Sequence, residues 1–179
     1  VLLSVPEKAH AESAVFYFNQ GLKKGKSRDF SGAIIDFKKS IEMEPNNPKS
    51  YASICGMKVM LGMNEEAVDD CYKALKVPKR NQFSLSSDDK AMLYANICGA
   101  KVNLKEYTET IKFCGKALAI NPQNAIAYYN RGSAKLALKD HYGAISDFNK
   151  AIDIDNTSYY SSYYYKGRGI GKQEIGDMK

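Results

Sequence analysis

The hydrophobic positions of the chain recur at the spacing of short amphipathic helices. Between residues 125 and 158, two apolar runs are separated by the polar segment 139–141. In the second run Ala144, Phe148 and Ile152 follow one another at every fourth position, which places them on one side of a helix. Each run is too short to be a stable helix by itself in water. The pattern therefore predicts a helical hairpin that packs against neighbouring elements.

The same pattern recurs upstream at a fixed distance. The segment 91–124 aligns with 125–158 at a step of 34 residues, and 48–81 and 14–47 continue the series. Between the second and third copies the step is 43 residues, so nine residues, 82–90, are inserted there. Equivalent positions hold an aromatic residue (Tyr17, Tyr51, Tyr94 and Tyr128) and a small one (Gly21, Cys55, Cys98 and Gly132). Self-similarity at a fixed period indicates a repeat architecture.

These positions resemble the tetratricopeptide repeat, a helix–turn–helix unit of about 34 residues with aromatic, small and closing proline residues at fixed places. The resemblance covers residues 14–158. It implies an all-α fold, a right-handed α-solenoid (superhelix) of stacked antiparallel helix hairpins, with four full repeats plus a terminal helix. We expect a single domain over residues 1–179. The predicted repeats are 14–47, 48–81, 91–124 and 125–158. An N-terminal helix extension is predicted over 5–13, an insertion over 82–90, and a partial fifth repeat or capping helix over 162–179.

The C-terminal segment is interpreted as the first helix of a fifth repeat, predicted over 162–175. If three residues are inserted, Tyr165 and Gly169 fall at the aromatic and small positions of the repeat. Gly167, Gly169 and Gly171 each lower the helix propensity by about 1 kcal/mol relative to alanine. We therefore expect this helix to depend on packing against the fourth repeat, with an exposed side available for self-association or for the rest of a longer chain.

In this family the first helix of each pair lines a concave face, so the resemblance implies a groove lined by residues not used in packing. Asn19, Asn96 and Asn130 occupy one position of the repeat, where the second copy has Ser53. Amide side chains both donate and accept hydrogen bonds, which suits an extended peptide, although asparagine is also common here in the family. The candidate peptide-binding residues are Phe18, Asn19, Leu22, Ser53, Met60, Met92, Asn96, Asn103, Ile126, Tyr129 and Asn130.

Most of the other predicted lining residues are small or apolar, which suits a hydrophobic peptide or helix that docks through apolar anchors. Members of the family that bind chaperones hold a terminal carboxylate with Lys, Asn and Arg residues. The matching positions here hold Phe18 and Leu22, or Met92 and Asn96, so no register supplies the cations. We expect no carboxylate clamp.

Catalytic and metal sites are not predicted. The chain has two histidines and no CxxC motif, so a zinc site is not expected. His10 and His141 have no Ser or Cys partner at a defined spacing. The segment 25–27 is similar to the end of a phosphate-binding loop, but Gln20 stands where the first glycine is required. We expect no enzymatic activity, cofactor or metal.

The four cysteines share two positions of the repeat, Cys55 with Cys98 and Cys71 with Cys114. Helices pack at these positions, so the cysteines are interpreted as small, buried and unpaired. Unpaired thiols favour a reducing, cytoplasmic compartment. The alternative is a disulfide within one hairpin, such as Cys55–Cys71.

Composition limits the choice of partner. The 179 residues are 44% hydrophobic and 26% charged, which is typical of a globular domain, and no apolar run is long enough to span a membrane. The net charge of +6 comes from lysines that lie among acidic residues on the second helices, so a solvated face is expected rather than a nucleic-acid site. The first residues, 1–13, lack a signal-peptide pattern, and we expect the sequence to be part of a longer chain.

The sequence thus predicts a non-catalytic protein–protein interaction scaffold that binds a peptide or helix of a partner in its groove. One alternative is a nucleic-acid-binding helical repeat protein, in which the basic excess and the tyrosines of 159–165 would contact a single strand. Another is an accessory or regulatory domain of a larger enzyme or membrane protein.

Overall fold

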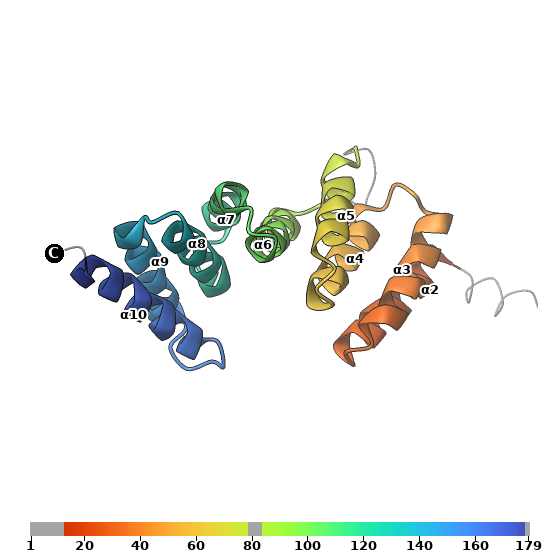
Figure 1. Cartoon of the computed structure of the whole chain (residues 1–179). Coiled ribbons are helices and arrows are strands. Elements are labelled where there is room, and N and C mark those ends of the chain that lie inside the picture. The colour runs from red at the N-terminus through yellow and green to blue at the C-terminus, as the bar shows by residue number, and fades with distance from the viewer. Residues whose placement is uncertain (1–12, 79–83, 178–179) are drawn as a thin grey trace, which may run out of the picture. The chain divides into compact units, whose positions relative to one another are not determined.

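The computed structural model describes residues 13–78 and 84–177, and over these residues it contains nine helices and no strand (Figure 1). The chain divides into two compact units, Val1–Asp89 and Lys90–Lys179. In both units consecutive helices form antiparallel hairpins that stack on one another, as the helical-repeat prediction requires. The all-α fold class is confirmed.

The first unit contains two hairpins. Helix α2 (Ala14–Lys26) packs against α3 (Phe30–Met43), and α4 (Pro48–Met60) packs against α5 (Asn64–Lys76). Helix α3 also contacts α4, which joins the two hairpins into one stack. A cluster of Ala33, Phe37 and Ile54 forms the buried core of this junction.

The second unit contains two further hairpins and a terminal helix. These are α6 (Ser87–Asn103) with α7 (Tyr107–Ile120), α8 (Ala125–Ala137) with α9 (His141–Ile154), and α10 (Ser161–Asp177). Helix α7 contacts α8, α8 contacts α9, and α10 covers α9. The elements that follow one another in sequence are thus neighbours in space, as in a solenoid.

Local signals in the sequence set the helix boundaries. The Asp29 and Asp140 carboxylates accept hydrogen bonds from the third residue of α3 and α9, each at 2.9 Å. Helix α6 is capped as well, because the Asp89 backbone N–H donates to the Ser86 hydroxyl at 3.1 Å and the Asp89 carboxylate accepts from the Ser86 N–H at 2.9 Å. The predicted extension 5–13 lies outside the described residues except for Ser13, which caps α2 instead of continuing it.

Each hairpin turn contains one residue in the left-handed region of backbone conformation. These residues occupy one position of the repeat and are Arg28 (φ 62°), Gly62 (φ 74°), Lys105 (φ 60°) and Lys139 (φ 64°). Glycine fits this conformation without steric cost, whereas the other side chains are held there by the surrounding hairpin. The turn geometry therefore repeats although its residue type does not.

The predicted small position of the repeat is buried in all four copies. A Cβ atom at Gly21 would lie 2.7 Å from the Phe37 ring, and one at Gly132 would lie 3.0 Å from the Phe148 ring. In the first and fourth hairpins glycine thus makes room for a phenylalanine on the second helix. The four hairpins thus share one packed position.

The second and third hairpins have cysteines at both of these positions, and the cysteines are bonded to each other. Cys55 pairs with Cys71 and Cys98 pairs with Cys114, with Cα atoms 5.2 and 5.1 Å apart. The favoured interpretation of unpaired thiols is therefore wrong for all four cysteines, and the alternative within-hairpin pairing is correct. The reason is geometric, because the two positions face each other across the helix pair. The inference of a reducing, cytoplasmic compartment loses its basis.

Three hairpins share an ion pair that the sequence analysis did not identify. A lysine of the first helix reaches a buried aspartate of the second in Lys24–Asp36, Lys58–Asp70 and Lys135–Asp147, with N–O distances of 2.7, 2.7 and 2.8 Å. Arg131 adds two hydrogen bonds to Asp147, at 2.9 and 2.6 Å, and these bonds raise its pKa above the usual value. In the third hairpin the aspartate is replaced by Phe113, and Lys101 pairs instead with Glu106 at 2.5 Å.

The terminal helix packs in a different register from the predicted one. Tyr164 is fully buried and Gly167 lies against Phe148, where an added Cβ would come within 2.6 Å of the ring. Tyr165 is 45% exposed and Gly169 has open space beside it, so the assignment of these two residues to the packing positions is wrong. The glycine nearest the Phe148 ring determines the register, because no larger residue fits there.

Among the described residues, no helix combines the length and the apolar character needed to cross a membrane.

Candidate peptide-binding surface

The first unit presents its predicted site residues on α2 and α4. Asn19 is exposed and Leu22 is 41% exposed, whereas Phe18 is half-buried because its ring packs against Phe37 at 5.5 Å. On α4, Ser53 is half-buried and Met60 is 61% exposed. This part of the row combines apolar side chains with one amide and one hydroxyl.

The second unit presents the remaining predicted residues on α6 and α8. Met92 and Ile126 are 53% and 48% exposed, and Asn103 is exposed at the end of α6. Asn96 is half-buried, whereas Asn130 retains 9% of its surface. Apolar and amide side chains therefore share this surface.

The two asparagines of the second unit lie on adjacent first helices. A Cβ atom built at Gly99 would lie 3.6 Å from the Asn130 amide nitrogen, so this amide packs against α6 on the side that carries Asn96. Neither amide forms a hydrogen bond with another group in the described part of the chain. Amides in this state have donors and acceptors to offer a ligand backbone.

Tyr129 belongs to an aromatic cluster, of which it is the only member among the predicted site residues. Its ring lies 5.5 Å from Tyr164, 6.0 Å from Phe148 and 6.4 Å from Tyr163. The Tyr163 hydroxyl lies 3.3 Å from that of Tyr159, and this hydrogen bond raises the pKa of Tyr163. Helix α10 therefore extends the surface of α8 with aromatic side chains, an extension that depends on the α10 register.

Charged groups are sparse among the eleven predicted site residues, none of which is ionisable except Tyr129. The lysines of the first helices at the packed positions are engaged in the ion pairs described above. In the described part of the chain no group of three or more His, Cys, Asp or Glu side chains could hold a metal ion. Within each unit the predicted site residues carry chiefly apolar or amide side chains.

One of the four hairpins matches a known family model. The family model of the tetratricopeptide repeat matches residues 125–158, the fourth copy of the pattern. The other three hairpins have the same turn geometry and buried small positions. The comparison thus identifies the fourth hairpin as similar to the tetratricopeptide repeat. No curated protein matches its sequence.

Solved structures of other proteins show the same fold. A crystal structure of MamA is 23% identical, with a TM-score of 0.69, and the match covers 93% of this chain and 88% of that one. YrrB, described as having an unusual peptide-binding site, is 17% identical over 94% of this chain and 81% of that one, with a TM-score of 0.73. The Cut9–Hcn1 hetero-tetramer of APC/C is 17% identical, with a TM-score of 0.76, over 87% of this chain but 30% of that one. At these identities the likeness concerns the fold alone.

Proposed function

We propose that this protein is a non-catalytic interaction scaffold of the tetratricopeptide repeat type whose first helices bind a peptide or a helix of a partner protein. The observation that carries the proposal is the pair of amides of Asn96 and Asn130. They have no hydrogen-bond partner in the described part of the chain, and they lie beside the exposed side chains of Met92 and Ile126. A peptide contributes both backbone hydrogen bonds for the amides and apolar side chains for the neighbours.

The ligand we propose is uncharged or weakly charged where it meets the row. None of the eleven candidate residues is a lysine or arginine, so a ligand held chiefly by its terminal carboxylate would find no cation there. The absence of a carboxylate clamp is therefore part of this proposal. Methionine side chains adapt to apolar anchors of various shapes.

Nucleic acid is the less favoured ligand. Single-strand binding needs unpaired cations along the phosphate backbone. Lys24, Lys58, Lys101 and Lys135 lie in ion pairs with acidic side chains of their own hairpins, so these four cations are already partnered.

The test begins with a peptide selected from a random phage-displayed library on the immobilised full chain. Fluorescence anisotropy then measures the affinity of that peptide for the chain and for the double variant Asn96→Ala/Asn130→Ala. Two lost hydrogen bonds of about 1 kcal/mol each should weaken binding by roughly 10- to 30-fold.

The matched control is Asn46→Ala, an exposed asparagine in the loop between α3 and α4. This variant should leave the affinity unchanged. The affinity should also vary by no more than a few-fold when the salt concentration is changed. Equal affinities of the double variant and the control would remove the asparagines from the site. Binding of single-stranded RNA that falls steeply with salt would replace the proposal with the nucleic-acid alternative.

A further inference from the structure

Four lysines on the second helices occupy one position of the repeat, opposite the tyrosines of the first helices. In the first and third hairpins the lysine covers the tyrosine ring, with Lys39 5.0 Å from the centroid of Tyr17 and Lys116 5.4 Å from that of Tyr94. In the second hairpin Lys73 pairs with Asp70 at 2.9 Å. In these three hairpins the ammonium group is therefore partnered.

The fourth hairpin differs because an arginine, rather than the lysine, lies over the tyrosine ring. Arg131 lies 5.3 Å from the Tyr128 ring centroid and is held there by its two hydrogen bonds to Asp147. Lys150, the equivalent of Lys39, has neither an ion pair nor a ring contact among the described residues. An ammonium group is thus left without a partner at this place.

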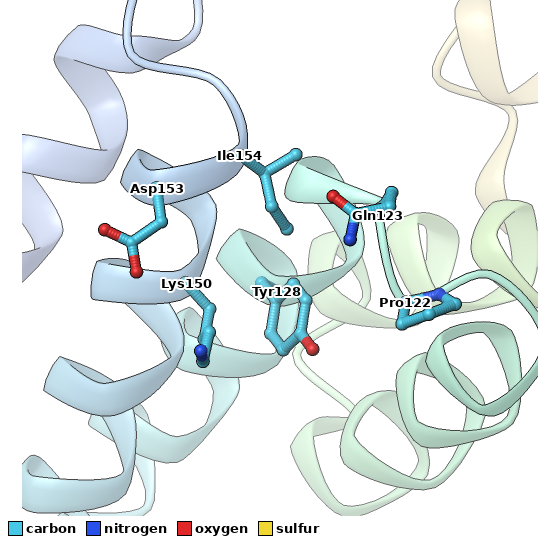
Figure 2. Close-up of a pocket in the computed structure, with 6 residues that line it drawn as sticks. All are labelled: Pro122, Gln123, Tyr128, Lys150, Asp153 and Ile154. Atoms are coloured by element: carbon cyan, nitrogen blue, oxygen red, sulfur yellow. The ribbon is translucent and has the colours of Figure 1, made fainter.

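Lys150, whose ammonium group has no partner, lines a cavity of about 370 Å³. The cavity is formed by the α7–α8 loop, the start of α8 and the end of α9, and its lining residues are Pro122, Gln123, Tyr128, Lys150, Asp153 and Ile154 (Figure 2). Figure 2 shows the Gln123 amide directed toward Tyr128, while the Asp153 carboxylate extends away from Gln123 and Pro122. The Asn121 side chain accepts a hydrogen bond from the Gln123 backbone N–H at 3.0 Å, which fixes this loop.

This cavity is separate from the row of asparagines. At about 100° per residue, Tyr128 projects roughly 160° away from Ile126 and from Asn130 around α8. A ligand in the cavity therefore contacts a different side of the helix from a peptide on the row.

We propose that this cavity binds a carboxylate of a peptide, with Lys150 as its counter-ion and the Tyr128 hydroxyl and Gln123 amide as further donors. One ammonium group beside an aspartate matches a monoanion and disfavours a phosphate dianion. Pro122 and Ile154 provide apolar contacts for an aliphatic stem. The carboxylate belongs either to a glutamate side chain or to the end of a peptide chain.

Two blocked probes distinguish these sources. One is a pentapeptide of alanines with a central glutamate and both ends capped, and the other is an acetylated alanine pentapeptide with a free terminal carboxylate. Titration of the full chain, followed by NMR chemical shifts at Gln123, Tyr128 and Lys150, should show binding of at least one. The variant Lys150→Gln should weaken it about tenfold, since a charged hydrogen bond is lost.

Two further variants control for the position and the sign of the charge. Lys116→Gln changes the equivalent lysine of the third hairpin and should leave the affinity unchanged, whereas Asp153→Asn should increase it. Binding of either probe that Lys150→Gln weakens by about tenfold supports the proposal. No binding up to about 10 mM, equal binding of a glutamine peptide, or insensitivity to Lys150→Gln would overturn it. A negative result in this experiment leaves the proposed function intact, because Asn96 and Asn130 do not line the cavity.

Discussion

At the scale of single residues, two of the polar side chains that the second unit buries, Asp147 and Tyr164, differ in whether they have a partner. Asp147 is 3% exposed and is compensated by Arg131 and Lys135. Tyr164 is fully buried, and its hydroxyl has no hydrogen-bond partner among the described residues. A buried polar group without a partner costs free energy, so Tyr164 contributes through its ring rather than through its hydroxyl.

Replacing Tyr164 with Phe should therefore leave the free energy of unfolding at pH 7 unchanged or raise it by up to about 1 kcal/mol. Burial, with the nearby Asp155 charge, raises the pKa of Tyr164 to about 12. Because the folded state holds this proton more tightly than the unfolded state, the neutral hydroxyl stabilises the fold below pH ~10. This contribution to the free energy of unfolding, on the order of 2 kcal/mol, is lost as the pH rises from about 10 to about 12. The variant should lack this loss in urea denaturation across that range.

The exposed Tyr165 serves as the control, and Tyr165→Phe should not change the stability at pH 7. A loss of more than about 1 kcal/mol in Tyr164→Phe would mean that the hydroxyl has a partner after all.

At the scale of elements, one of two contacts joins the two helices within each hairpin at the same position of the repeat. Glycine packs against phenylalanine within the first hairpin and within the fourth, and a disulfide links the two helices within the second and within the third. Helix α10 uses the glycine contact again, with Gly167 against Phe148. The sequence of α10 contains four glycines, so its stability as a helix depends on this contact.

The glycines of α10 should differ sharply in their tolerance of alanine. Gly167→Ala places a Cβ atom within 2.6 Å of the Phe148 ring and should cost about 1–3 kcal/mol or release α10. Gly169→Ala meets no atom within 4 Å and should stabilise the helix by up to about 1 kcal/mol. Thermal unfolding followed by circular dichroism measures both. The reverse order would restore the register expected from the sequence.

At the scale of the whole molecule, each of the two units contains one disulfide. Cys55–Cys71 lies in Val1–Asp89 and Cys98–Cys114 in Lys90–Lys179. Each closes a loop with a sequence separation of 16 residues. A loop of this length restricts the unfolded chain enough to stabilise the fold by roughly 3 kcal/mol.

Substituting Ala for both Cys55 and Cys71 should therefore destabilise the first unit by about 2–4 kcal/mol, with a smaller effect on the second. Hydrogen exchange of the amides of α2–α5 and of α7–α10 measures the two units separately. The double variant Cys98→Ala/Cys114→Ala is the matched control and should show the opposite distribution. In the denatured but unreduced chain, four reactive thiols would show that the cysteines are not paired.

The sequence by itself determined the elements and their frame. A 34-residue period places aromatic and small side chains at positions that can only be buried if helices pair, and local caps such as Asp29 and Asp140 begin the helices. The exposure of Leu22, Met92 and Ile126 also follows from the period, because they fall opposite the packed side of their helices. These features are local, so periodicity contains them.

Tertiary structure alone decided which side chains meet across helices. The cysteine pairs and the Lys–Asp pairs each join the two helices of a hairpin, and the register of α10 depends on the contact of Gly167 with Phe148. The contact of Arg131 with Tyr128 joins neighbours on one helix, but the fourth hairpin alone has an arginine there. The distance between paired helices and the identity of the opposite residue determine these contacts. A repeat pattern averages over its copies, so it predicts the shared packing and misses the differences that give the fourth hairpin its free lysine and its cavity.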